Sequence, residues 1–304
     1  MLGYLWVNLE ETIVVVVMPM VIFAIALLIV VKVILVGIEF VQEKRYEQTE
    51  YFKQTHNPYK TLRKDKGLTG EYYIYKRLKP LTGYKRFLFN CYVPKSNDER
   101  TEIDVLLIHE SGIYVFESKN YSGWIFGKES DRYWTQTLPV GRGRSQKSRF
   151  LNPIIQNRVH LKWLKEFLQD DSLCFYSYIA FSERCTLKNI RLTSGEHRVM
   201  NRYHLLSDVE HVAQNTGKKL TSEQVDSLYR KLYALTQIDD SVKHSHIERI
   251  HNKYQPSSKN RGKDQTCPWC GGQLVLRTAS KGSRKGKRFW GCSHYPKCRY
   301  MRNK

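Results

Sequence analysis

The sequence predicts a chain of three parts, in which a mixed α/β domain stands between a membrane helix and a small zinc-ribbon-like module. Near the N-terminus, the 19 residues from Ile13 to Val31 contain no charge. Segments with the patterns of strands and helices follow one another between residues 67 and 237. Near the C-terminus, four cysteines recur with the spacing of a metal site.

The composition restricts the classes of partner. The 304 residues include 50 Lys or Arg and 29 Asp or Glu, which gives a net charge of +21. Such an excess favours nucleic acid or an anionic membrane surface as a partner. With 41% hydrophobic residues the chain is not a disordered one. Seven cysteines, an odd number, argue against a fully paired disulfide framework, so we expect a reduced, cytosolic environment.

The apolar N-terminal segment, residues 12–38, is predicted to be a transmembrane helix, because about 20 apolar residues span a bilayer. A cleaved signal peptide is one alternative, but no Lys or Arg precedes the run. A buried soluble helix is a weaker alternative, because so much all-round apolarity is rare in a soluble chain. Acids stand before the segment and bases follow it. The positive-inside rule then places the N-terminus outside and the main domains in the cytoplasm. Residues 39–66 are interpreted as a basic juxtamembrane segment, either solvated or in contact with lipid.

The α/β domain is expected to span residues 67–237. The predicted helices begin near Gly70, Asn152, Ser207 and Thr221, the second and last with capping signals. The predicted strands are 87–93, 102–108, 113–118 and 175–181, with a further hairpin near 124–126 and 133–135. Residues 141–149 are interpreted as a mobile basic loop that contacts a nucleic-acid backbone, and residues 238–265 as a linker.

The last segment, residues 266–304, contains Cys267, Cys270, Cys292 and Cys298. A CxxC pair supplies two ligands from one tight turn, and four thiolates around Zn²⁺ form a closed, structural site. So short a segment cannot build its own core, so metal binding would supply most of its folding free energy. His294 is a possible competing ligand.

Two carboxylates and a lysine lie in the apolar strands of the α/β domain. Glu117 and Lys119 share one face of their strand because side chains alternate. If the preceding turn is Glu110-Ser111, Asp104 lies opposite Glu117; if it is Ser111-Gly112, Asp104 lies opposite Lys119. Either register brings the three side chains to one face, where they would suit phosphodiester hydrolysis assisted by Mg²⁺ or Mn²⁺ held by Asp104 and Glu117. A solvent-facing charged stripe is the alternative.

The C-terminal segment resembles the four-cysteine zinc domains of bacterial type I topoisomerases, from Cys267-Pro-Trp-Cys through Phe289-Trp-Gly-Cys to Cys298. The resemblance implies binding of single-stranded DNA. From residue 259 onward there are 13 Lys or Arg and one acid, with aromatic residues between them, which agrees with such binding. The residues expected to contact nucleic acid are Trp269, Trp290, Tyr295, Arg277 and Lys297.

The α/β domain resembles the nuclease-related domain family, NERD, in the order of its motifs: Gly70-Glu71, Ile103-Asp104, Val115-Phe-Glu-Ser-Lys119 and Asn152-Pro-x-x-Gln156. This resemblance implies a restriction-endonuclease-like fold with a PD-(D/E)xK core, a mixed sheet flanked by helices. It also implies a catalytic site of Glu71, Asp104, Glu117, Lys119 and Gln156. His160, one turn after Gln156, stands where related nucleases have an aromatic residue.

We therefore expect a membrane-anchored, metal-dependent nuclease whose zinc module binds DNA. The alternative is a catalytically silent nuclease fold that tethers DNA to the membrane. A sensor of lipid surfaces is a third hypothesis, which the aromatic residues of the zinc module disfavour.

Overall fold

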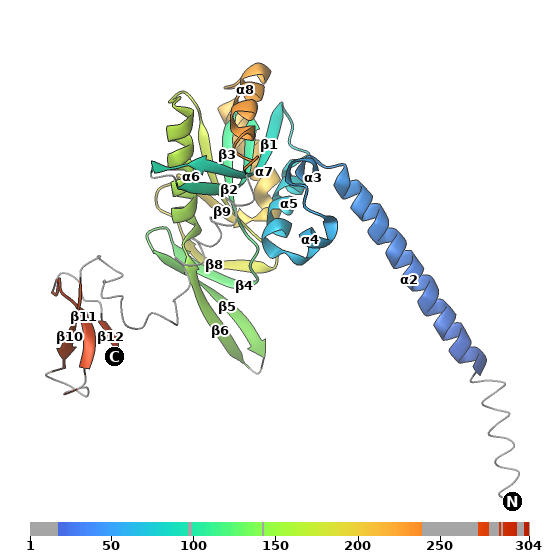
Figure 1. The fold of residues 1–304 in the computed structure, drawn as a ribbon, viewed down its shortest axis with the longest axis horizontal. Coiled ribbons are helices and arrows are strands. Elements are labelled where there is room, and N and C mark those ends of the chain that lie inside the picture. The colour runs from blue at the N-terminus through green and yellow to red at the C-terminus, as the bar shows by residue number, and fades with distance from the viewer. Residues whose placement is uncertain are drawn as a thin grey trace, which may run out of the picture. The chain divides into compact units, whose positions relative to one another are not determined.

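The chain forms two compact units, residues 1–238 and residues 239–304. The structure is a computed structural model that describes residues 18–96, 99–141, 143–238, 273–279, 286, 288–296 and 301–303. Figure 1 labels the elements of both units.

The helices of the first unit are α2 (Met18–Glu47), α3 (Glu50–Thr55), α4 (Tyr59–Lys64), α5 (Lys66–Leu78), α6 (Pro153–Leu168), the 3₁₀ helix η3 (Arg202–His204), α7 (Leu205–Thr216) and α8 (Ser222–Tyr233). Its strands are β1 (Lys85–Pro94), β2 (Arg100–His109), β3 (Gly112–Lys119), β4 (Gly123–Lys128), β5 (Tyr133–Gly141), β6 (Arg144–Leu151), β7 (Phe175–Phe181), β8 (Cys185–Arg191) and β9 (His197–Asn201).

The main sheet is mixed, with the strand order β1-β2-β3-β7-β9. β1, β2 and β3 are antiparallel neighbours, whereas β7 runs parallel to both β3 and β9. The parallel pairing of β3 with β7 requires a crossover, and α6 lies within it. Strand β9 was not predicted from the sequence.

Helices cover both faces of the main sheet, so consecutive residues of its strands, which point to opposite faces, are buried. One core packs α5 and α7 against side chains such as Val105 and Phe116. The other core packs α6 and α8 against side chains such as Leu106 and Val115. Because both faces are covered, β3 reads as a continuous apolar run. The expectation of an α/β fold with a mixed sheet between helices is confirmed.

A second sheet has the strand order β6-β5-β4-β8. Residues expected to form a basic loop instead form the end of β5 and most of β6, and this expectation is wrong. The cause is local: β6 is nearly all polar and pairs along its whole length with β5, from Leu151 opposite Tyr133 to Arg144 opposite Gly141. Its structure comes from backbone pairing rather than from an apolar face. Strand β8, which pairs in parallel with β4, was also not predicted.

The stretch of residues 39–66 forms the end of α2 and the short helices α3 and α4. Although its composition is polar, it contributes Tyr46, Tyr51 and Leu62 to the main core. The Tyr46 hydroxyl donates a hydrogen bond to the carbonyl of Asn57 (2.8 Å). These contacts seat the end of α2 directly on the α/β domain.

Helix α2 is the one helix in the described part of the chain that is long and apolar enough to cross a membrane. The rest of the described chain does not cover its apolar part, where Phe23 and Leu28 are 72% and 68% exposed. Residues 12–17, the start of the predicted membrane segment, lie outside the described residues.

The second unit contains a three-stranded antiparallel sheet of β10 (Leu274–Thr278), β11 (Arg288–Cys292) and β12 (Met301–Asn303). Leu274 and Cys292 are buried, and Trp290 packs against them.

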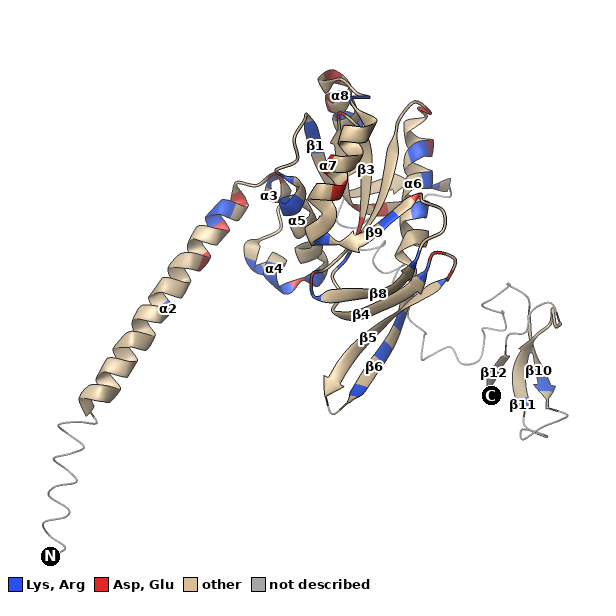
Figure 2. Ribbon diagram, turned by 180° about the vertical axis from the view of Figure 1, so that it is seen from behind, with Lys and Arg blue, Asp and Glu red and all other residues tan. Residues whose placement is uncertain are grey.

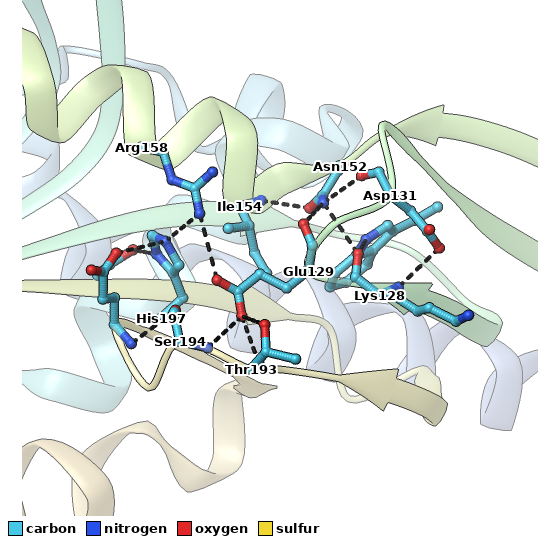
Figure 3. Close-up of polar contacts among 12 residues, drawn as sticks. Lys128, Glu129, Asp131, Asn152, Ile154, Arg158, Thr193, Ser194 and His197 are labelled. Carbon is cyan, nitrogen blue, oxygen red and sulfur yellow. Dashed lines mark hydrogen bonds and ion pairs between the residues drawn. The ribbon is translucent and has the colours of Figure 1, made fainter.

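A polar cluster joins α6 to the turn between β4 and β5 and to the loop between β8 and β9 (Figure 3). Asn152 caps α6, because its Oδ1 accepts the N–H of Ile154, while its Nδ2 donates to the carbonyls of Glu129 and Asp131. The buried Glu129 carboxylate accepts the N–H groups of Thr193 (2.7 Å) and Ser194 (2.9 Å). Hydrogen bonds from Ser194 and Thr193 lower the pKa of Glu129 to about 2.

We predict that Glu129→Gln lowers the free energy of unfolding by roughly 1–3 kcal/mol at pH 7, because it removes charge-assisted hydrogen bonds. A depressed carboxyl pKa stabilises the fold above about pH 4.5, and this contribution is lost as the pH falls toward 2. The difference between variant and wild type should therefore shrink over that range in thermal unfolding followed by circular dichroism. Glu196→Gln, at a side chain that is 71% exposed, is the control. A difference in stability between variant and wild type that does not change with pH would contradict the lowered pKa of Glu129.

Candidate nuclease site and zinc module

The register of β2 and β3 brings the acidic residues together. The paired residues run from His109 opposite Gly112 to Val105 opposite Phe116, and the turn is Glu110-Ser111. Of the two registers that the sequence allowed, this is the one that places Asp104 opposite Glu117. Glu117 lies on the face of the sheet that α6 covers, next to the core of Leu106 and Val115. The alternation of β2 changes near Asp104, because Ile103 and Leu106 belong to the same core.

Glu117 is the buried centre of this site, with 3% of its surface exposed. Its Oε1 accepts a hydrogen bond from Nζ of Lys119 (2.6 Å), and its Oε2 lies 3.0 Å from Nε2 of His160 on α6. Burial alone would raise the pKa of Glu117, but Lys119 and His160 outweigh it and lower the pKa to about 2. Glu117 and Lys119 therefore form a buried ion pair.

Asp104 lies beside this ion pair. Its Oδ2 accepts the backbone N–H of Ser118 (2.8 Å), just beyond the last residue pair of the β2–β3 ladder. Burial raises the pKa of Asp104 well above its usual value, and the negative charges of Glu117 and Glu71 add to this effect. Asp104 therefore favours its protonated form when no cation is present.

Glu71 reaches the same region from α5. The helix approaches β3 closely at Gly70, where an added Cβ would collide with the hydroxyl of Ser118. Glu71 is buried and accepts a hydrogen bond from the Tyr51 hydroxyl (3.1 Å). Burial, with the charge of Glu102, raises the pKa of Glu71 to about 8. The charge of Glu71 adds to the raised pKa of Asp104, but the hydrogen bond of Glu71 is to Tyr51 on α3 and not to Asp104.

Helix α6 carries Gln156 and His160, which lie one turn apart and so on one side of the helix. His160 is buried and bridges Glu117 to the Thr101 hydroxyl, which lies 2.7 Å from its Nδ1. Gln156 is half-buried. Asn157 fixes the helix on the sheet by donating from Nδ2 to the carbonyl of Val115 and the hydroxyl of Ser177.

The donor set fits a hard divalent cation. Asp104 and Glu117 offer carboxylate oxygens, and burial together with the neighbouring carboxylates raises the pKa of Asp104, an effect that a bound cation would oppose. Within the described residues, no three His, Cys, Asp or Glu side chains form a metal-binding group. Magnesium sites commonly use one or two carboxylates and complete their shell with water and substrate phosphate. Two carboxylates are therefore sufficient for such a site.

Two contacts of the site were missed in the sequence. Thr101 orients His160, and Tyr51 holds Glu71. Tyr51 lies in the polar stretch after the membrane segment, and Thr101 lies at the start of β2, so neither carried a recognisable motif. The alternating pattern of β2 could not identify Thr101 as a contact of the site, because its partner, His160, lies on a helix 59 residues further along the chain.

The zinc ligands fall mostly outside the described part of the chain. Cys267, Cys270 and Cys298 lie outside it, and Cys292 lies inside it, at the end of β11. Cys292 is buried, and its Sγ accepts the N–H of His294 (3.4 Å). A backbone N–H donated to a cysteine sulfur is typical of a thiolate ligand environment.

Of the residues expected to contact nucleic acid, some lie inside and some outside the described part of the chain. Trp269 and Lys297 lie outside the described residues. Tyr295 is 60% exposed, and the guanidinium of Arg277 lies over its ring at 5.8 Å. Trp290 is half-buried against Leu274 and Cys292. Tyr295 and Arg277 thus form an exposed pair, whereas Trp290 also has a packing role.

Two protein families match separate parts of the chain. The nuclease-related domain family matches residues 66–182, from the start of α5 to the end of β7. This range contains Glu71, Asp104, Glu117, Lys119 and Gln156. The topoisomerase DNA-binding C4 zinc finger family matches residues 264–304, which contain the four cysteines.

Two individual proteins are similar to parts of this chain. An uncharacterized protein of Bacillus anthracis is 32% identical over 196 residues, which cover 64% of this chain and 88% of that protein. DNA topoisomerase 1 of Archaeoglobus fulgidus is 40% identical over 84 residues, which are 28% of this chain and 11% of the topoisomerase. No solved structure matches the chain significantly. The chain belongs to the nuclease-related domain family and carries a topoisomerase-type C4 zinc finger at its C-terminal end.

Proposed function

We propose that this protein is a membrane-anchored, metal-dependent nuclease that hydrolyses phosphodiester bonds of DNA and binds DNA through its zinc finger. The observation that carries the proposal is the meeting of Asp104, Glu117 and Lys119 at the end of the β2–β3 pairing, where Lys119 contacts Glu117 and Asp104 accepts the N–H of Ser118. The match of this region to the nuclease-related domain family supports it.

The site residues have distinct roles in this proposal. Asp104 and Glu117 would hold Mg²⁺ or Mn²⁺, which supplies charge neutralisation at the phosphate and activation of water. Lys119, held 2.6 Å from Glu117, keeps a positive charge where a phosphate oxygen can be stabilised. His160 and Thr101 orient the Glu117 carboxylate. Glu71 and Gln156 flank the site and would help to position substrate or water.

Helix α2 supports the proposed membrane anchor. A helix of this length with an uncovered apolar surface would be unstable in water. Lys44 and Arg45 in its last turn would face the cytoplasmic headgroups, with the α/β domain on the same side.

The zinc finger supports the proposed substrate class. Its exposed Tyr295–Arg277 pair suits stacking against bases and contact with phosphates, which favours a single DNA strand over a duplex. Structural Zn²⁺ held by Cys267, Cys270, Cys292 and Cys298 would fold this module.

One observation favours a second function, that of a catalytically silent DNA tether. Both oxygens of Glu117 are already engaged, by Lys119 and His160, so a cation would have to compete with them. The two functions differ in one respect only, which is whether bound DNA is cleaved.

We predict that Asp104→Asn reduces Mg²⁺- or Mn²⁺-dependent cleavage by about 100-fold or more, because it removes a ligand and a charge at the reacting centre. The full chain is purified in detergent and assayed on single- and double-stranded DNA. The variant should fold at least as stably as wild type, because burial and the carboxylates of Glu117 and Glu71 disfavour a charge on residue 104, which asparagine does not carry. Asp171→Asn, in the loop after α6, should cleave normally. Binding without cleavage by wild type with either cation would instead establish the silent tether.

We predict that Cys292→Ser abolishes stoichiometric Zn²⁺ binding and lowers the affinity for single-stranded DNA, since one lost thiolate opens the site and unfolds the module. Zinc is measured by atomic absorption and affinity by fluorescence anisotropy. Cys174→Ser, at a half-buried cysteine of the α/β domain, is the matched control. Retention of full zinc by the Cys292 variant would refute the ligand assignment.

A further inference from the structure

The second sheet of the α/β domain has one face without an acidic residue. Strands β4, β5, β6 and β8 contain six Lys or Arg and no Asp or Glu. Figure 2 shows the basic residues recurring along β6, in a hairpin that extends from the body of the domain. Within the described chain, none of these six side chains forms an ion pair.

The register shows which residues share the outer face. Lys147, Thr137, Trp124 and Thr186 lie side by side across the four strands. Arg149, Thr135, Phe126 and Asn189 form the next row. The opposite face carries Ile125 and Trp134, which are fully buried against Phe181 and Ile154. The basic face is therefore the one that the domain does not cover.

Aromatic rings are interleaved with these charges. Nζ of Lys188 lies over the ring of Trp124 at 5.8 Å, and the Arg149 guanidinium lies over the ring of Tyr133 at 5.3 Å. Trp124 and Tyr133 are nonetheless 41% and 39% exposed. Lysines on edge strands commonly prevent aggregation, which would account for charges on β6 and β8. It does not account for exposed aromatic rings on the central strands β4 and β5.

We propose that this basic face, formed by Trp124, Tyr133, Lys147, Arg149, Lys188 and Arg191, binds a single strand of nucleic acid. Its basic side chains would contact phosphates, and its two exposed rings would stack on unpaired bases. β4 begins four residues after Lys119, so the face starts close to the candidate site in the chain. The inference rests on the proposed function in that the bound nucleic acid would be the substrate. Binding of a single nucleic-acid strand by this face does not itself require cleavage.

The test measures binding of the full chain in detergent to a fluorescein-labelled oligothymidine of about 20 nucleotides, without Mg²⁺ or Mn²⁺. Lys147→Gln/Arg149→Gln should lower the affinity about tenfold at low salt and reduce the slope of log affinity against log salt by about 1.4, or about 0.7 for each lost phosphate contact on a single strand. Trp124→Leu should lower the affinity by a similar factor with an unchanged slope, because it removes stacking alone. Both measurements are repeated in chains that also carry Cys267→Ser/Cys270→Ser, so that binding by this face is distinguished from binding by the zinc finger.

The matched control is Lys162→Gln/Lys165→Gln on α6, which removes two lysines that also lie over aromatic rings. It should change neither the affinity nor the slope. Thermal melts establish that each variant is folded. Unchanged affinity and slope in the Lys147/Arg149 variant would overturn the proposal. Cleavage unaffected by Asp104→Asn would instead overturn the nuclease assignment and leave this inference standing.

Discussion

A buried carboxylate has to be compensated, and at Glu117 this requirement organises the surrounding elements. Taking a carboxylate out of water costs several kcal/mol unless an opposite charge and hydrogen bonds replace the water. Lys119 supplies the charge from the same strand, and His160 supplies the second contact from α6. Helix α6 must therefore sit at one fixed height on the sheet. Asn152 at its first turn and Asn157 against β3 and β7 hold it there.

Charge compensation is uneven across the site. The pKa of Glu117 is lowered, whereas those of Asp104 and Glu71 are raised by burial and by neighbouring carboxylates. One lysine cannot neutralise three ionised carboxyl groups, and burial together with repulsion from neighbouring carboxylates makes Asp104 and Glu71 favour their protonated forms. A divalent cation between Asp104 and Glu117 would relieve that repulsion. The close approach of α5 to β3 at Gly70 brings Glu71 near the site, where its charge adds to the raised pKa of Asp104.

Much of this arrangement could be predicted from the sequence, but in unequal measure. Strand alternation indicated that Glu117 and Lys119 share a face, which agrees with their ion pair, and the structure has the register with the Glu110-Ser111 turn. The change of alternation near Asp104 carries no signal in the sequence. The capping signals at Asn152 and Thr221 predicted the starts of α6 and α8. Strand β6 was missed because an exposed polar strand has no periodicity in hydrophobicity. The packing of Tyr46 and Tyr51 was missed because their neighbours are charged.

The most direct test of the central claim is whether the Asp104–Glu117 pair binds a cation at all. Electron paramagnetic resonance of Mn²⁺ titrated into the full chain in detergent distinguishes free from bound cation without any nucleic acid present. The account predicts saturable Mn²⁺ binding that Mg²⁺ displaces and that Asp104→Asn abolishes, while Cys292→Ser leaves it intact. Binding that survives Asp104→Asn, or its absence from the wild-type protein, would contradict the account.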